Sequence, residues 1–118
     1  MARRRPGPKI PAAIFIAEDR QGAYAALKAS KKTEDTQLFA HLQKAIATLK
    51  EDVFAGVQIP RDRVPVEYYS RFPNLGSLWK MNLTRSWRLI YSVAGEDGAV
   101  VLVIEWLSHT EYERRFHY

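Results

Sequence analysis

Three closely spaced stretches in the second half of the chain show the side-chain patterns of β-strands. Residues 78–83 and 87–93 alternate between apolar and polar positions, while residues 100–107 are apolar except for one glutamate. Alternation is typical of strands with one buried face, and a continuous apolar run is typical of a strand covered on both faces. The links at 84–86 and 94–99 are short, and the second contains two glycines, which favour a hairpin turn. We therefore predict an antiparallel meander whose last strand lies inside the sheet.

The same alternation assigns the side chains of the first two strands to opposite faces. The set that we expect to face the core is Trp79, Met81, Leu83, Leu89 and Tyr91. The opposite face then carries Lys80, Asn82 and Arg88 together. A lysine, an amide and an arginine held side by side on short strands indicate an anion-binding site. For each of them singly, plain solvation of an exposed face is the alternative.

The first half of the chain predicts one short strand and two helices. Residues 12–17 form an apolar run that favours a strand, although a buried helix start has the same pattern at this length. Asp19 is placed to cap a helix over residues 20–30, and Thr33 to cap a longer helix that Gly56 would end. The apolar residues of the longer helix recur at helical spacing and should lie across the core face of the sheet. They are Leu38, Leu42, Ala45, Ile46, Leu49 and Val53.

A long connection at residues 57–77 contains three prolines and separates the helices from the meander. Pro65 can start a short helical turn there, with the rings of Tyr68, Tyr69 and Phe72 packed inward. Stacking of these rings on nucleic-acid bases is the alternative. We expect packing for at least two of the three.

The last strand runs into a capping-box pattern, in which Ser108 is the N-cap and Glu111 follows three residues later. A short terminal helix is predicted, with His109 at its first position. The positive end of the helix dipole disfavours imidazolium there, so the ring should stay neutral and able to take a proton. An exposed histidine without a role is the alternative.

These elements predict an α+β fold: an antiparallel sheet of about four strands, with two N-terminal helices on one face and a short C-terminal helix. A chain of 118 residues is long enough for a single self-sufficient core, which we place at residues 12–118. Residues 1–11 contain three prolines and three consecutive arginines, so we expect a disordered basic arm.

The net charge of +5 is unevenly distributed along the chain. Four of the positive charges lie in the N-terminal arm. Between residues 61 and 88 two acidic residues stand against six basic ones, which are Arg61, Arg63, Arg71, Lys80, Arg85 and Arg88. A concentration of positive charge around the first strands of the meander favours a polyanionic partner.

The composition limits the cellular compartment in which the protein is expected and the kinds of site that it can form. The chain has no cysteine, which excludes disulfides and suits a reducing cytoplasm. It has no apolar run long enough to cross a membrane. His41, His109 and His117 are scattered and show no metal-ligand spacing, so we expect neither a metal nor another cofactor.

Two segments resemble a known family. The stretch LWKMNLTRSWRLIYSV is similar to the strand hairpin of the RelE/ParE toxin superfamily, and EWLSHTEYERRF is similar to the end of its chains. The order of elements fits the family over residues 12–118, while the motifs cover about residues 78–116. The resemblance implies a toxin of a type II toxin–antitoxin system.

Members of the RelE branch cut messenger RNA on the ribosome without a metal. Carried over by position, the resemblance implies catalytic roles for Lys80, Arg88 and His109. The attacking group would be a ribose 2′-hydroxyl, with His109 or Lys80 taking its proton and with Arg88 and Lys80 stabilising the phosphoryl charge. The RNA would be held by Arg61, Arg63, Arg71, Asn82 and Arg85.

The partners expected on this basis are the ribosome-bound RNA and an acidic, partly disordered antitoxin. Asn82, Thr110 and Phe116 depart from the family's pattern and favour an alternative without catalysis. That alternative is a binding protein of the gyrase-poison type or an inactive toxin homologue. A simple nucleic-acid-binding domain that depends on the N-terminal arm is the third possibility.

Overall fold

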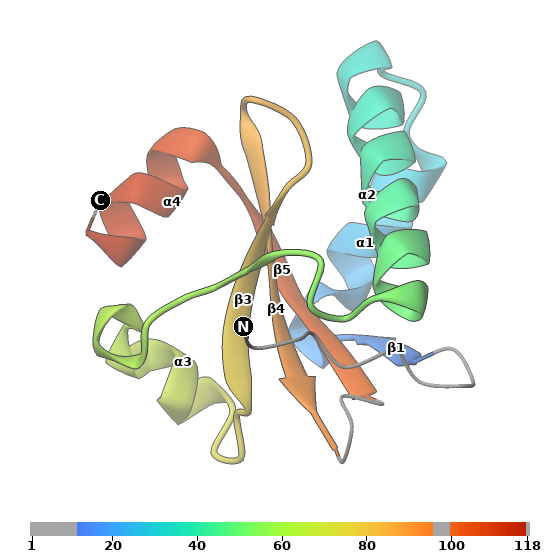
Figure 1. Ribbon diagram of the computed structural model, residues 1–118. Coiled ribbons are helices and arrows are strands. Elements are labelled where there is room, and N and C mark those ends of the chain that lie inside the picture. Colours follow the sequence, from blue (N-terminus) through green and yellow to red (C-terminus); the bar gives the residue numbers. More distant parts are fainter. Residues whose placement is uncertain (1–11, 96–99, 118) are drawn as a thin grey trace.

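The computed structural model describes residues 12–95 and 100–117. They form one five-stranded sheet in the order β1-β5-β4-β3-β2, covered by helices on both sides (Figure 1). The expected arm at residues 1–11, the second glycine of the β4–β5 loop and Tyr118 lie outside the described residues. The strands are β1 (Ala13–Ile16), β2 (Val57–Gln58), β3 (Ser77–Asn82), β4 (Trp87–Ala94) and β5 (Val100–Ser108). The helices are α1 (Gln21–Ala29), α2 (Thr33–Glu51), α3 (Val66–Arg71) and α4 (His109–Phe116), with short 3₁₀ turns at Glu18–Arg20 and Arg61–Arg63.

The α+β class and the meander of β3, β4 and β5 are as predicted, but the rest of the sheet differs from the prediction. The sheet has five strands and is mixed, because β1 pairs with β5 in parallel while the other neighbours are antiparallel. The fifth strand is β2, a two-residue strand inside the connection expected to be a loop. As predicted, β5 lies inside the sheet, between β1 and β4.

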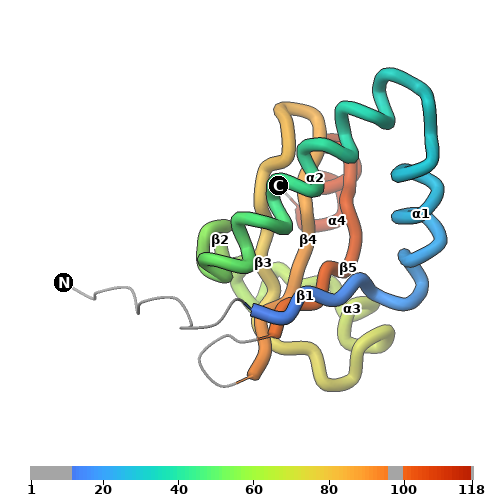
Figure 2. Tube along the Cα trace, turned by 90° about the vertical axis from the view of Figure 1, so that its right-hand side faces the viewer, coloured from blue at the N-terminus to red at the C-terminus, as the bar shows by residue number. Residues whose placement is uncertain are grey.

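The two N-terminal helices pack on one face of the sheet, and Figure 2 shows α2 running diagonally across the strands. The apolar stripe of α2 buries Leu38, Leu42, Ala45, Ile46 and Leu49. They pack against Leu83, just after β3, and against the strand residues Leu89, Tyr91, Val93, Val101 and Val103. Burial of side chains of this size contributes about 1.5–3 kcal/mol each, so this core fixes the sheet against α2.

The opposite face is covered in part by α3 and α4, which lie on the same side of the sheet in Figure 1. A second core forms there from Ile59, Tyr68, Leu78, Ile90, Ile104, Leu107, Tyr112 and Phe116. Tyr68 is buried and Phe72 packs beside it, which confirms the prediction that at least two of the three rings of the connection pack inward. The face that carries the predicted anion site is therefore bordered by helices.

The helix boundaries correct three details of the prediction. Asp19 lies inside a 3₁₀ turn and accepts a hydrogen bond from Arg71 at 2.9 Å instead of capping α1. Thr33 is the first residue of α2 and makes no capping bond. The second helix ends at Glu51, and Gly56 is required for another reason, because a Cβ atom there would clash with the backbone of β3.

The predicted cap of α4 is present. The Ser108 hydroxyl accepts a hydrogen bond from the backbone N–H of Glu111 at 3.1 Å. The Glu111 carboxylate turns away from the cap and pairs with Arg114 and Arg115. His109 is the first residue of α4, as predicted.

Candidate functional site

The register of β3 and β4 places the three predicted anion-binding residues on one face. Lys80 is opposite Ile90, and Asn82 is opposite Arg88. Because directly opposed residues of an antiparallel pair project from the same face, Lys80, Asn82 and Arg88 share the face that α4 borders. The prediction of a shared face is confirmed.

The junction of β5 and α4 brings His109 to the same place. Its backbone N–H donates to the carbonyl of Ser86 at 2.7 Å, which ties the start of α4 to the link between β3 and β4. The ring Nδ1 of His109 lies 2.7 Å from Nη2 of Arg88. Residues of β3, of β4 and of the start of α4 therefore meet at one cluster, which we call the β3–α4 site and define as Lys80, Asn82, Arg88 and His109.

Arg88 is the most tightly held member of the site. Its Nη1 donates to the carbonyl oxygens of Thr84, Arg85 and Trp87 at 3.0–3.2 Å, and its guanidinium fastens the β3–β4 link to β4. The residue is only 8% exposed. Arg88 is thus a structural clamp as well as a candidate anion ligand.

The contact with Arg88 determines which ring nitrogen of His109 carries the hydrogen. A guanidinium group donates hydrogen bonds and cannot accept them, so Nδ1 of His109 must accept with its lone pair. The ring hydrogen is then on Nε2, which lies 3.2 Å from the carboxylate of Glu113 one turn later. In this arrangement Arg88 occupies the lone pair of Nδ1, and another donor can reach it only if Arg88 moves away.

Lys80 is the free cation of the site. Its ammonium group lies 5.4 Å from the centre of the Tyr112 ring, and no carboxylate in the described part of the chain pairs with it. A cation over an aromatic face is stabilised while its N–H groups stay available to a ligand. Asn82 is exposed on the same strand, two residues further along.

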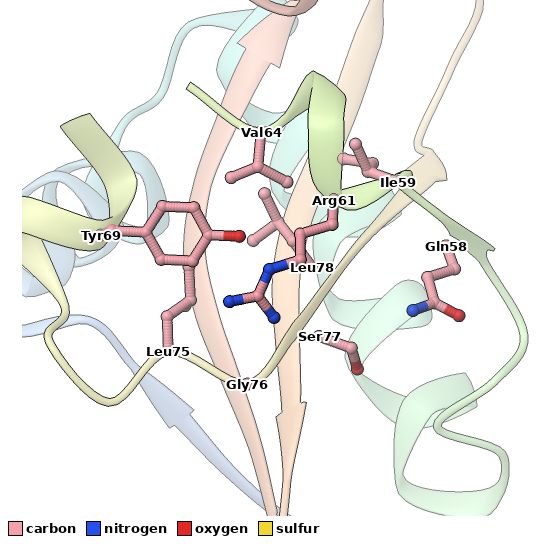
Figure 3. Close-up of a pocket in the computed structure, with 9 residues that line it drawn as sticks. All are labelled: Gln58, Ile59, Arg61, Val64, Tyr69, Leu75, Gly76, Ser77 and Leu78. Atoms are coloured by element: carbon pink, nitrogen blue, oxygen red, sulfur yellow. The ribbon is translucent and has the colours of Figure 1, made fainter. Parts of the chain in front are cut away.

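The arginines predicted to bind RNA are not gathered at one place. Arg61 borders a hollow of about 280 Å³ beside the start of β3, where its guanidinium lies 5.8 Å from the ring centre of Tyr69 (Figure 3). Arg63 donates to the carbonyl of His117 at 2.8 Å. Arg85 is exposed on the β3–β4 link, and Arg71 belongs to a buried network described next. Arg61 and Arg85 therefore remain the best placed of the four to meet a polyanion.

The sequence patterns did not predict a network of hydrogen bonds and ion pairs around Glu105. Glu105 is 1% exposed, and both of its oxygens accept hydrogen bonds: from Arg20 and Arg71 on one oxygen, and from Arg115 and Tyr68 on the other. Burial, together with the bond to the Glu105 carboxylate, raises the pKa of the Tyr68 hydroxyl well above its usual value. The available signal was the single charge in an otherwise apolar strand, since a buried carboxylate needs cationic partners.

In residues 12–95 and 100–117, no three His, Cys, Asp or Glu side chains are grouped so that they could hold a metal ion. Over the same ranges, every helix is too short or too polar to cross a membrane. No protein-family model, curated protein or solved structure matches the chain.

Proposed function

We propose that this chain is the toxin of a type II toxin–antitoxin pair and acts in the cytoplasm as a metal-independent endoribonuclease on ribosome-bound messenger RNA. The proposal depends on one observation above all. Lys80, Asn82 and Arg88 project from one sheet face, and His109 contacts Arg88 there. These are residue types that bind a phosphodiester and move a proton beside it, and the strand and helix motifs that carry them resemble those of the RelE/ParE superfamily.

The reaction would proceed by attack of the ribose 2′-oxygen on the adjacent phosphorus. A phosphoryl oxygen that takes the Nη2 hydrogen bond of Arg88 releases Nδ1 of His109, and the freed lone pair accepts the 2′-hydroxyl proton. The bond from phosphorus to the 5′-oxygen breaks, and the ammonium group of Lys80 gives that oxygen a proton. The products are a 2′,3′-cyclic phosphate and a 5′-hydroxyl end.

The test uses purified protein, ribosomes and a defined messenger. We expect translation to stop and new RNA ends to appear that carry a 2′,3′-cyclic phosphate. A messenger with a single 2′-deoxynucleotide on the 5′ side of the cut should resist cleavage at that position only, because the nucleophile is missing. Intact messenger in a translation reaction that the protein does not slow would refute the proposal.

A second candidate function has an observation in its favour. Arg88 is 8% exposed and clamps the β3–β4 link, and both ring nitrogens of His109 are engaged. A site held in this way suits a binding protein that uses the same fold without catalysis, such as a gyrase poison. Inhibition of DNA supercoiling by the purified chain, with messenger left intact, would favour this candidate.

The proposed partner is an acidic antitoxin. Arg61 and Arg85, which are exposed, and the half-buried Lys80 have no carboxylate partner among the residues that the structure describes. An acidic segment that folds on binding would neutralise them and block access to the β3–α4 site. Co-expression with the neighbouring reading frame should relieve toxicity and yield a complex whose affinity falls as salt is raised.

A further inference from the structure

A cavity on the α3–α4 side of the sheet has no role in the proposed reaction. It has a volume of about 410 Å³ and opens between the two helices. It is bordered by Pro65, Glu67, Tyr68, Arg71, Arg114, Arg115 and His117. Three arginines and one glutamate give the lining an excess of positive charge.

Two of the three arginines are held in place from below. Glu105 is buried under the cavity and accepts hydrogen bonds from Arg115 at 2.9 Å and from Arg71 at 3.4 Å. Tyr68 donates to the same carboxylate, and its ring also packs against Phe116. The cationic lining is therefore positioned before any ligand arrives, which reduces the entropy lost on binding.

The arginines keep unused donors despite these ion pairs. Arg71 donates to Glu105 and Asp19, and Arg115 donates to Glu105 and Glu111. Each guanidinium has more N–H groups than these contacts engage. Arg115 also has a side-chain hydrogen bond with Tyr68, and its guanidinium still has N–H groups beyond these contacts.

Arg114 extends the donor surface to the rim of the cavity. Its Nε and Nη2 pair with Glu111, while its side chain is 73% exposed. Arg114 and Arg115 together lower the pKa of the Glu111 carboxyl, so that carboxylate stays ionised beside them. Because Arg115 also holds Glu111, Arg114 can be removed without leaving that carboxylate unpaired.

We propose that this cavity is a phosphate-binding site whose ligand groups are Arg71, Arg114 and Arg115. Planar guanidinium groups with spare donors match the oxygens of a phosphate group, and a partly enclosed site strengthens each contact. The cavity is large enough for a phosphate together with the sugar that carries it. This proposal goes beyond cleavage, since the site would bind phosphate whether or not the β3–α4 site cuts RNA.

The cavity and Lys80 lie at opposite ends of a row of aromatic rings. Three rings in contact lead from one to the other: Lys80 lies over Tyr112, Tyr112 contacts Phe116 at 5.0 Å, and Phe116 contacts Tyr68 at 5.5 Å. These rings are buried, so a strand of RNA that joins the two places would run over the outer surface of α4 and place a second phosphate at the cavity. The other source of the same chemistry is a free phosphate compound.

The test measures binding without cleavage. The probes are inorganic phosphate, followed by amide shifts in nuclear magnetic resonance, and a 2′-O-methylated single strand of about ten nucleotides, which lacks the attacking hydroxyl. Three variants are compared with the wild type. Arg114→Gln removes a proposed ligand group, Glu67→Gln removes the opposing carboxylate, and Lys50→Gln makes the same charge change as Arg114→Gln on α2, across the sheet.

We expect Arg114→Gln to weaken phosphate binding about tenfold and Lys50→Gln to leave it unchanged. Glu67→Gln should strengthen it, because the negative charge on the lining is removed. If the variants rank in the same order for oligonucleotide affinity, the phosphate belongs to RNA. In that case the slope of log affinity against log salt concentration should also be smaller by about 0.7 in Arg114→Gln. If only inorganic phosphate follows it, the ligand is a free phosphate compound. Equal binding by Arg114→Gln and Lys50→Gln with both probes would overturn the proposal.

Discussion

Nη2 of Arg88 lies 2.7 Å from Nδ1 of His109. This contact joins β4 to the first residue of α4 and fixes the orientation of both side chains. The arginine can only donate, and this fixes the hydrogen of the imidazole on Nε2. The contact also closes the site, because the lone pair that would take a proton is occupied. A ligand that competes for Arg88 would therefore free the lone pair of His109, as the proposed cleavage requires.

The first prediction concerns Arg88 as a clamp. Arg88→Ala should lower the free energy of unfolding by about 2–3 kcal/mol, because it removes hydrogen bonds from a buried charge to two carbonyl oxygens of the β3–β4 link and to that of Trp87 in β4. Urea unfolding followed by circular dichroism measures this. Arg85→Ala, at an exposed position of the same link, should stay within about 0.5 kcal/mol of the wild type. Equal urea midpoints for the two variants would show that the clamp contributes nothing.

The pattern of apolar residues predicted the parts of the fold that depend on periodicity. Alternation assigned Lys80 and Arg88 to one face correctly, and helical spacing identified the buried stripe of α2. Ser108 was recognised as a cap because its hydroxyl meets a local backbone donor. Each of these depends on neighbours within a few residues, which is why the sequence alone reveals them.

The features that were missed depend on residues far apart in the chain. The direction of β1 depends on where α1 and α2 return the chain, and the apolar run at residues 12–17 carries no sign of it. The two residues of β2 are too few to show any period. At the site, the sequence placed Arg88 on the correct face but could not show that carbonyls of a neighbouring link would bury it. The four partners of Glu105 come from three separate segments and have no common spacing.

The second prediction concerns the pH dependence of stability through Tyr68. Burial and the bond to Glu105 raise its pKa, so the folded protein keeps a proton that the unfolded chain releases. The stabilising contribution is complete below the ordinary tyrosine pKa of about 10, and it is lost as the pH rises above that value. The stability advantage of the wild type over Tyr68→Phe should therefore shrink above pH 10. Its slope should approach about 1.4 kcal/mol per pH unit.

Urea titrations from pH 7.5 to 11 test this dependence, and Tyr69→Phe serves as the control. That variant removes a hydroxyl outside the Glu105 network. Its difference from the wild type should change less over the same range. A constant difference between wild type and Tyr68→Phe at all pH values would contradict the proposed linkage.

The third prediction compares two glycines. A Cβ atom at Gly56 would clash with the carbonyl oxygen of Lys80 and lie 2.6 Å from the hydroxyl of Tyr91. Gly56→Ala should therefore cost about 1–3 kcal/mol and disturb β3 at Lys80. Gly22 in α1 has no atom within 4 Å of the same position, and Gly22→Ala should stabilise the protein by up to about 1 kcal/mol. Thermal unfolding of the two variants should give shifts of opposite sign, and shifts of the same sign would refute the steric explanation.

The last prediction separates function from stability at Lys80. Lys80→Met keeps the aliphatic stem but removes the charge, and the contact that it loses over Tyr112 is a cation–aromatic one worth about 0.5–1 kcal/mol. The fold should therefore survive, with a urea midpoint close to that of the wild type. RNA cleavage should fall at least about a hundredfold, because the phosphoryl charge and the leaving oxygen both lose their cation. Lys50→Met, which removes an exposed cation on the other side of the sheet, should leave cleavage unchanged. A folded Lys80→Met protein that cuts messenger as fast as Lys50→Met would remove Lys80 from the reaction, and with it the assignment of this sheet face as the place where the phosphodiester binds.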